Sequence, residues 1–442
     1  DRAGARRAAG GGRGGAASRT LGRRPTLDAM RGGALAGAAV VGLTAGAATA
    51  QPWVAGPLPG DLAGARSVVV TARDEPLFTA PTGDGSRRGA AVLGAMLPLY
   101  AARPGPGCEG TWLMVGALAW VCSGRVEPSP WRATPPGEPR SDAHGLPYRY
   151  HFVGEYGTLG YRDLATAELG APDAELAPGF AVAVVQTRAR SPGDEFALTT
   201  KGFWLPMRDL GPAHPSLFHG EELRGALDIA WVYTEEAPSF DGPGGRRLPG
   251  GLAQFSVVTV LESVARGPRR WYRIGDREWL DGRDLRVPTR PDPMPAVGPA
   301  ERWIDVDRGQ QVLTAYEGDR PVFATLVSTG RGPDGTQEST PSGLHRIWIK
   351  LLSSDMDNLE DDGASHLYAI QDVPWVMYFD RGYGLHGTFW HRSFGRVRSH
   401  GCVNLAPLDA RRLFDWTGPR LPAGWSAVLP TAYDRGTLVH VR

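Results

Sequence analysis

One short segment near the C-terminus gathers residue types that can do nucleophilic chemistry. The run Ser399-His400-Gly401-Cys402 follows His386. A thiol becomes a strong nucleophile when a nearby histidine or dipole lowers its pKa. Gly401 permits a turn that other residues resist, and backbone amides around such a turn can hold a developing oxyanion. These residues therefore point to acyl transfer by a cysteine–histidine pair.

A zinc site is the alternative chemistry for the same cluster. Its ligands would be His386, His391, His400 and Cys402. Their spacings match no common structural zinc pattern, so neither a metal nor another cofactor is predicted. No motif position requires His391, which is interpreted as a structural or loop residue.

The segment around Cys402 resembles the signature of L,D-transpeptidases with a YkuD-type catalytic domain. That signature is a histidine, a spacer, and then Ser/Thr-His-Gly-Cys-x-Asn or Arg. The spacer between His386 and Ser399 has 12 residues, somewhat short of the commonest spacing, which bears on substrate preference more than on chemistry. Four further segments resemble the family: Ser328-Thr329-Gly330, Thr340-Pro341-Ser342-Gly343, Asp372-Val373-Pro374-Trp375 and Gly436-Thr437-Leu438-Val439.

The resemblance implies a role for each residue of the signature. Cys402 would be the nucleophile, His386 its base, and the backbone carbonyl of Gly387 the group that orients the imidazole. The remaining residues would line the site: Ser399, His400, Gly401 and Asn404, with the amides of His400, Gly401 and Cys402 forming an oxyanion hole. Arg398 could bind a carboxylate of the substrate, a task that suits a guanidinium.

The implied enzyme is a cysteine acyltransferase that acts on peptidoglycan stem peptides. It would form 3-3 cross-links through a thioester. Two alternatives use the same site: an L,D-carboxypeptidase, and an enzyme that attaches an envelope protein to peptidoglycan. A third alternative belongs to another class, a non-catalytic protein that binds the cell wall.

Three segments that precede this domain repeat one another, at residues 67–127, 151–212 and 228–287. Their short alternating runs, split by Gly and Pro turns, favour small all-β barrels. The last residues of the segments match best. Trp204 to Leu210 aligns with Trp279 to Leu285, and Trp120-Val121 begins a shorter form of the same sequence. The segments resemble bacterial SH3-like domains, which implies cell-wall binding or spacing of the catalytic domain.

The predicted fold class is therefore mainly β. Three small SH3-like β barrels precede a mostly-β YkuD-type catalytic domain at residues 301–442, with a helix expected over 411–416. Pro- and Gly-rich composition predicts linkers at residues 51–66 and 288–300.

An export signal is expected over residues 1–50, with Met30 as an alternative start. A positive charge at Arg31 and a small apolar stretch precede Ala48-Thr49-Ala50, which is typical of a signal peptide and its cleavage site. Secretion by the general or the twin-arginine route, and retention as an anchor, stay open. We expect a protein of the periplasm or cell wall with no stable membrane span after cleavage.

The charge balance excludes partners that need a strong global field. The 48 basic and 47 acidic residues leave a net charge of +1, so nucleic acid is not an expected partner. Lys201 and Lys350 are the only lysines in the chain. A single arginine is therefore weak support for a binding role here.

The three cysteines predict one disulfide and one free thiol, because an exported chain with an odd count leaves one over. Cys108 and Cys122 lie in the same module and flank strand-like residues, so they are the expected pair. Cys122-Ser123-Gly124 also resembles the nucleophile motif of NlpC/P60-type cell-wall amidases. Its context does not fit, because Cys122 ends a strand led by Trp120.

Thiol labelling of the native protein tests whether Cys402 is the free thiol and Cys108 and Cys122 form the disulfide. We expect Cys402 to react and Cys108 and Cys122 to stay unlabelled until a reductant is added. Peptide mapping by mass spectrometry gives the positions. Label on Cys108 or Cys122 with none on Cys402 would contradict the assignment.

Overall fold

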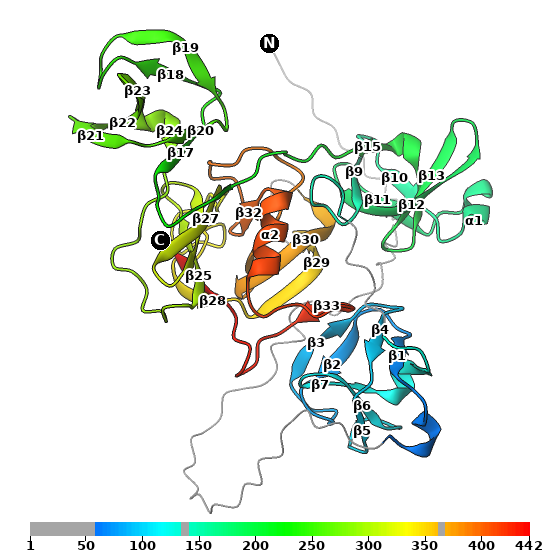
Figure 1. Ribbon diagram of the computed structural model, residues 1–442. Helices are drawn as coiled ribbons and strands as arrows, with labels where there is room; N and C mark the ends of the chain where they lie inside the picture. Colours follow the sequence, from blue (N-terminus) through cyan, green and yellow to red (C-terminus); the bar gives the residue numbers. More distant parts are fainter. Residues whose placement is uncertain (1–57, 134–140, 361–366) are drawn as a thin grey trace, which may run out of the picture. The chain divides into compact units, whose positions relative to one another are not determined.

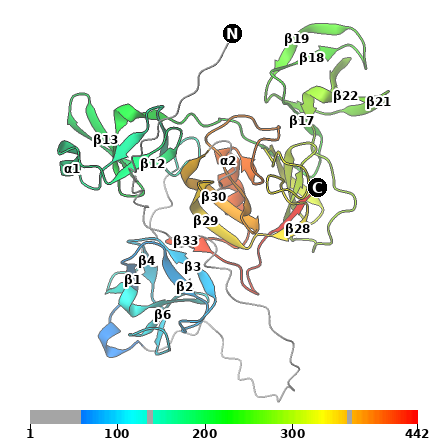
Figure 2. The same ribbon diagram turned by 180° about the vertical axis from the view of Figure 1, so that it is seen from behind.

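The computed structural model describes residues 58–133, 141–360 and 367–442. The expected export signal lies outside the described residues. Strands dominate the described chain, which confirms the expectation of a mainly-β protein (Figures 1 and 2). No helix in these ranges is long and apolar enough to cross a membrane.

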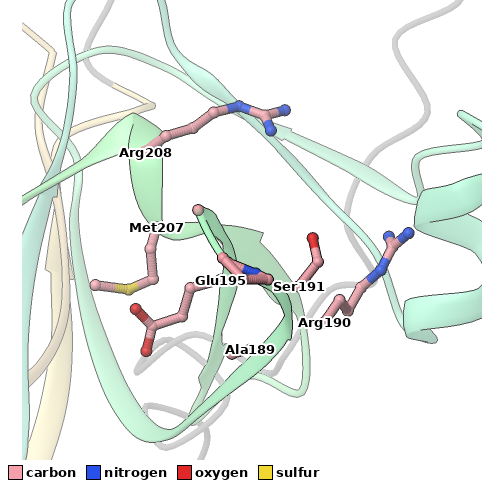
Figure 3. A pocket seen from close by; sticks show the side chains of 8 residues that line it. Ala189, Arg190, Ser191, Glu195, Met207 and Arg208 are labelled. Atoms are coloured by element: carbon pink, nitrogen blue, oxygen red, sulfur yellow. The ribbon is translucent and has the colours of Figure 1, made fainter.

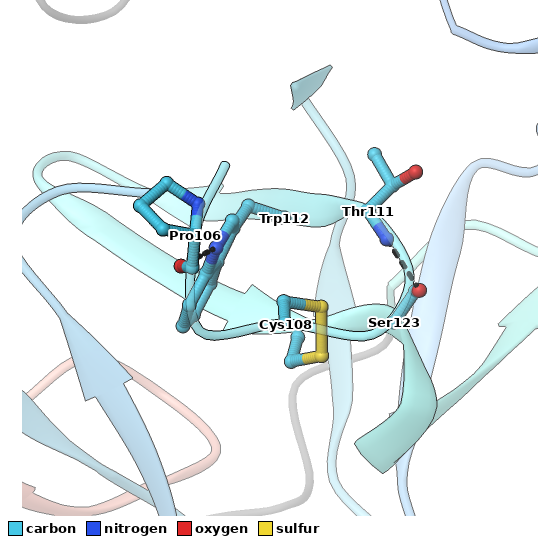
Figure 4. Close-up of a disulfide and its surroundings, with 6 residues drawn as sticks. Pro106, Cys108, Thr111, Trp112 and Ser123 are labelled. Carbon is cyan, nitrogen blue, oxygen red and sulfur yellow. Dashed lines mark hydrogen bonds between the residues drawn. A yellow bond between two sulfur atoms is a disulfide. The ribbon is translucent and has the colours of Figure 1, made fainter. Parts of the chain in front are cut away.

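The first module is built from eight short strands. A disulfide joins Cys108 to Cys122, with the Cα atoms 5.5 Å apart, and closes the loop before β6 onto the end of β7 (Figure 4). The disulfide also removes Cys122 as a candidate nucleophile. The strands are β1 (Ser67–Val70), β2 (Glu75–Phe78), β3 (Arg87–Ala91), β4 (Met96–Pro98), β5 (Ala101–Arg103), β6 (Trp112–Gly116), β7 (Ala119–Cys122) and β8 (Val126–Ser129).

The second and third modules also consist of short antiparallel strands, with one short helix. In the second these are β9 (Arg149–Val153), β10 (Thr158–Gly160), α1 (Leu164–Glu168), β11 (Ala174–Leu176), β12 (Ala181–Ser191), β13 (Asp194–Thr199), β14 (Trp204–Pro206) and β15 (Leu210–Pro212). After β16 (Glu221–Glu222), the third contains β17 (Ile229–Val232), β18 (Glu236–Phe240), β19 (Arg247–Ala253), β20 (Val257–Thr259), β21 (Glu262–Arg266), β22 (Arg269–Gly275), β23 (Glu278–Asp281) and β24 (Leu285–Arg286).

The three modules share the closing unit that the repeated sequences suggested. In each module, the strand that carries the repeated tryptophan (Trp120, Trp204 or Trp279) leads into a one-turn 3₁₀ helix and a further short strand. The 3₁₀ helices are η3 (Ser123–Arg125), η4 (Met207–Asp209) and η5 (Gly282–Asp284). The described strands form open sheets, however, so the expected SH3-like barrels are not confirmed.

The C-terminal domain contains two sheets and one longer helix. Its elements are β25 (Arg302–Asp307), β26 (Val312–Glu317), β27 (Arg320–Leu326), β28 (Gly343–Arg346), β29 (Ile349–Asp357), β30 (Ala369–Asp380), β31 (Tyr383–Gly387), β32 (Val403–Leu405), α2 (Pro407–Trp416), β33 (Trp425–Val428) and β34 (Leu438–Val441). One sheet has the order β16-β27-β26-β25-β34-β28, and the other runs β33-β29-β30-β31-β32. Strand β33 also pairs with β3, so this second sheet continues into the first module.

The largest apolar cluster of this domain joins its two sheets. It combines side chains from the first sheet, such as Ile304 and Leu313, with Met377 and Leu385 of the second sheet. Helix α2 packs against β30 and β31 and adds Leu413 to the same core (Figure 1). The strands that carry the candidate site therefore lie on a rigid support.

Helix α2 starts earlier than the sequence suggested, at Pro407. Proline favours the first helical position, because its missing N–H would have no partner there. At the other end the chain leaves helical geometry at Thr417. The buried amino group of Lys350 donates hydrogen bonds to the carbonyls of Phe414 and Thr417, which satisfies part of the helix end.

Replacing Lys350 by methionine should lower stability in a pH-dependent way. Lost hydrogen bonds to the helix end should cost about 1–3 kcal/mol near pH 9. Burial lowers the pKa of Lys350 to about 7, below its usual 10.5. Between pH 7 and pH 10.5, Lys350 binds a proton in the unfolded chain and not in the folded one. The free energy of unfolding of the wild-type protein therefore decreases as pH falls through this range, and that of the variant does not.

Urea unfolding of both proteins at pH 9 and pH 7 measures this difference. The stability gap between wild type and Lys350→Met should narrow toward pH 7. A gap that widens toward pH 7 would mean that the folded protein favours the charged amine.

Candidate active site

The signature residues lie on two neighbouring strands of the second sheet. Strand β31 pairs in parallel with β32, and His386 lies opposite Asn404. Cys402 directly precedes β32, two residues before Asn404. Because side chains of an extended chain alternate between faces, Cys402 continues the face that Asn404 shares with His386.

The turn before Cys402 requires glycine. Gly401 has a φ of +121°, which other residues rarely adopt. A Cβ atom there would also lie 2.4 Å from a ring carbon of Tyr383. The close approach of Tyr383 therefore depends on the absence of a side chain at position 401.

His386 is held in one tautomer by the backbone. Its side chain is buried, and Nδ1 lies 3.2 Å from the carbonyl oxygen of Gly387. A carbonyl only accepts, so Nδ1 carries the proton and Nε2 is left with its lone pair. The ring stacks on Trp390 at 5.6 Å between centroids, which fixes its plane. This is the contact with Gly387 that the family resemblance implied.

Burial keeps both members of the pair neutral. It lowers the pKa of His386 to about 4, with the Gly387 carbonyl acting in the opposite direction. It raises the pKa of Cys402 to about 11, and a backbone hydrogen bond with Gly384 only partly offsets this. The sequence-based expectation of a thiol with a lowered pKa is therefore not met in the free protein.

Three tyrosines lie around the thiol. Burial, and after it the nearby charge of a Cys402 thiolate, raise the pKa of Tyr378 to about 12. The same two causes, in the same order, raise the pKa of Tyr368 and Tyr383. Tyr383 is also fixed by a hydrogen bond from its hydroxyl to the Gln337 carbonyl, at 2.9 Å. These phenol rings give the thiol a largely apolar wall.

The hydroxyl of Ser399 organises the turn. It accepts a hydrogen bond from the Gly401 amide at 3.1 Å and donates one to the Cys402 carbonyl. The Gly401 amide is thereby engaged within the turn, whereas the amides of His400 and Cys402 form no hydrogen bond with the described residues. That these three amides form an oxyanion hole stays a prediction.

Two histidines that the sequence left open have separate partners. His391 is buried; its Nδ1 accepts from the Ser393 amide at 3.2 Å, and its Nε2 lies 2.9 Å from the side-chain amide of Asn404. The atom of Asn404 nearest to Nε2 is Nδ2, so a neutral ring that accepts at Nδ1 requires the Asn404 amide to be turned over, with its oxygen toward the protonated Nε2. His391 therefore orients Asn404, a role that no motif revealed.

His400 lies on the exposed side of the turn. Its Nε2 is 2.8 Å from a guanidinium nitrogen of Arg331, which also pairs with Glu338 at 2.8 Å. The ring of Tyr368 stacks on His400 at 5.5 Å. Arg398 is exposed, and its charge helps to lower the pKa of His391, after burial, to about 3. A contact of Arg398 with substrate stays a prediction.

A separate recess lies on the second module, away from these residues. It has a volume of about 620 Å³ and lies between the β12–β13 hairpin and η4 (Figure 3). Arg190 at its rim forms ion pairs with Glu168 at 3.2 Å and Asp194 at 3.4 Å. None of the signature residues contributes to its lining.

Comparison with known proteins identifies the C-terminal domain. Residues 301–441 match the YkuD family model, described as the L,D-transpeptidase catalytic domain. This region is therefore a YkuD-type L,D-transpeptidase catalytic domain. No curated protein matches the chain.

Several solved L,D-transpeptidases are similar to the chain. One from Xylanimonas cellulosilytica shares 22% identity, covers 35% of this chain and 65% of its own, and has a TM-score of 0.23. The catalytic domain of the E. faecium enzyme shares 25% identity over 32% of this chain and 98% of its own, at a TM-score of 0.25. One from Mycobacterium smegmatis shares 16% identity over 59% of this chain and 99% of its own, also at a TM-score of 0.25. The chain thus spans less than two thirds of the Xylanimonas chain. These TM-scores are low, so the identification rests on the family model.

The neutral state of Cys402 and His386 predicts a steep pH dependence of thiol alkylation. The rate with uncharged iodoacetamide should rise about tenfold per pH unit between pH 7 and pH 10, as the thiolate fraction does. Mass spectrometry gives the rate for Cys402, with circular dichroism at each pH as the control for folding. A plateau that begins near pH 7 would instead indicate a preformed thiolate–imidazolium pair.

Proposed function

We propose that this protein is an exported L,D-transpeptidase that acts on peptidoglycan stem peptides through a thioester on Cys402. The observation that carries the proposal is the pairing of β31 with β32. It brings the imidazole of His386, oriented by the Gly387 carbonyl, beside the strand that Cys402 directly precedes. The family match of residues 301–441 supports the same reaction class.

The acylation step follows from the neutral pair. Cys402 Sγ attacks the carbonyl that follows the diamino acid of a donor stem peptide, while Nε2 of His386 takes the thiol proton. The C–S bond forms and the amide C–N bond breaks. His386⁺ gives its proton to the departing amine, which leaves as the terminal D-amino acid. The Cys402 amide would stabilise the oxyanion on the way.

The second step decides the product. An amine of an acceptor stem attacks the thioester, His386 takes the amine proton, and the thiol leaves protonated, which gives a 3-3 cross-link. Water in place of the amine gives an L,D-carboxypeptidase, and an amine of an envelope protein gives an attached protein. No cofactor enters either step. The mainly-β modules before the domain, which resemble SH3-like modules, would bind the wall or hold the domain at a distance from it.

Export to the periplasm or cell wall belongs to the same proposal. Its support is the signal-like composition of residues 1–50 and the substrate, which lies outside the cytoplasmic membrane. The disulfide Cys108–Cys122 agrees with an oxidising compartment.

Removal of either member of the pair should abolish turnover without unfolding the protein. Cys402→Ala and His386→Ala should each lose activity almost completely, and the double variant should be little worse, because nucleophile and base act as a unit. The assay is incubation with a disaccharide-tetrapeptide donor and mass spectrometry of the products. A dimer that has lost one D-amino acid marks transpeptidation, and a tripeptide marks hydrolysis.

Thermal unfolding of the variants is the control for structure. Activity within about tenfold of wild type, which is roughly 1.4 kcal/mol in the barrier, would remove that residue from the mechanism. A wild-type protein that binds the donor and forms neither product would favour the non-catalytic wall-binding alternative.

A further inference from the structure

A buried threonine lies directly behind the turn that carries Cys402. The side chain of Thr340 is fully buried. Its hydroxyl accepts a hydrogen bond from the Gly330 amide at 2.8 Å and donates one to the Gly401 carbonyl at 2.7 Å. The bonds span 10 and 61 residues of the chain, respectively. They link the end of the first sheet to the turn before the nucleophile.

The bond to Gly401 fixes the orientation of one peptide group. A trans peptide is planar, and its C=O and N–H point in opposite directions. The N–H that belongs to the same peptide as the Gly401 carbonyl is the amide of Cys402. When Thr340 holds the carbonyl on the buried side, the Cys402 amide must point the other way, toward the side of the thiol.

The turn needs this anchor because glycine does not hold its own conformation. At a φ of +121°, Gly401 has a wide choice of nearby backbone angles. The Ser399 hydroxyl holds the peptide group before Gly401, through the Gly401 amide, and the peptide group after Cys402, through the Cys402 carbonyl. Thr340 holds the peptide group between Gly401 and Cys402.

The structure around Thr340 is shaped for this contact. A Cβ atom on Gly330 would lie 2.6 Å from the Thr340 amide nitrogen and 2.9 Å from the Gly401 Cα. Only glycine at position 330 lets the three backbone segments come so close. Pro341 holds the backbone of the preceding residue, Thr340, away from helical geometry.

We propose that Thr340 is a positioning residue for acyl transfer, whose hydroxyl aims the Cys402 amide at the oxyanion. The inference rests on the proposed function, because an oxyanion forms only if Cys402 attacks a carbonyl. Loss of one donor from an oxyanion hole typically costs about 10²–10³ in kcat. Because the Thr340 hydroxyl acts through the amide, its loss should cost less, about 10- to 100-fold.

The test compares two chemistries at the same thiol. Acyl transfer from the tetrapeptide donor builds negative charge on a carbonyl oxygen, and alkylation by iodoacetamide does not. Thr340→Val removes the hydroxyl and nearly keeps the shape, and Thr340→Ser restores the hydroxyl. Thr340→Ala is compared with Thr340→Ser as a second pair that differs by the hydroxyl alone, should the valine variant fail to fold.

Thr325→Val provides a matched control. Thr325 is also fully buried in this domain, and its hydroxyl donates to Asp409 in the first turn of α2. Its loss should lower the unfolding temperature by an amount similar to that of Thr340→Val. It should leave kcat within about threefold of wild type, because Asp409 and Thr325 do not contact the Cys402 turn.

The proposal predicts a selective loss of acyl transfer. Thr340→Val and Thr340→Ala should lower kcat by about 10- to 100-fold with little change in KM, and the alkylation rate of Cys402 should stay within about threefold. Thr340→Ser should recover kcat to within about threefold of wild type. This pattern would support an orienting role rather than a general effect on folding.

Two results would overturn the inference and one would overturn its basis. If kcat of the hydroxyl-free variants stays within threefold of wild type, the Cys402 amide needs no anchor. If alkylation falls as far as kcat, Thr340 supports the turn as a whole. If wild type is alkylated at Cys402 but transfers no acyl group, the proposed function fails, and the inference about Thr340 fails with it.

Discussion

The parallel pairing of β31 with β32 is the constraint on which the candidate site depends. It sets His386 opposite Asn404 and brings Cys402 onto the same face. The two strands are rigid because α2 and the first sheet cover them with a continuous apolar core. The remaining contacts refine that placement. Gly387 selects the tautomer of His386, and Ser399 and Thr340 fix the peptides on either side of Cys402.

Burial governs the charge state of this pair. It favours the neutral thiol and the neutral imidazole, and in the described residues no acidic side chain is paired with His386 to oppose it. A backbone carbonyl orients the ring without adding charge. In the proposed reaction, a neutral imidazole supplies no positive charge before attack, so stabilisation of the oxyanion falls on the backbone amides. The geometry of the Gly401–Cys402 peptide matters to the proposal for this reason.

The two lysines of the chain show where arginine does not suffice. Lys350 places a compact amino group between two carbonyls at the end of α2. Lys201 fits between Asp355 and Asp372, at 2.6 and 3.0 Å. A planar guanidinium is larger and presents its donors in a fixed fork, whereas an ammonium directs three donors from one point. In a chain whose other basic residues are all arginine, both lysines therefore have structural positions.

The sequence alone determined the features that depend on residue type and local spacing. These include the mainly-β class, the closing units of the modules, the disulfide Cys108–Cys122, the free thiol of Cys402 and the signature that the YkuD match bears out for residues 301–441. Only the tertiary structure decided what comes from contacts between distant segments. Open sheets in place of the expected barrels, the continuation of β33 into β3, the partner of Asn404 and the link from Thr340 to Gly401 belong to this group. The pKa of Cys402 belongs there too, because burial is a property of the folded chain, whereas a motif shows only which groups are present.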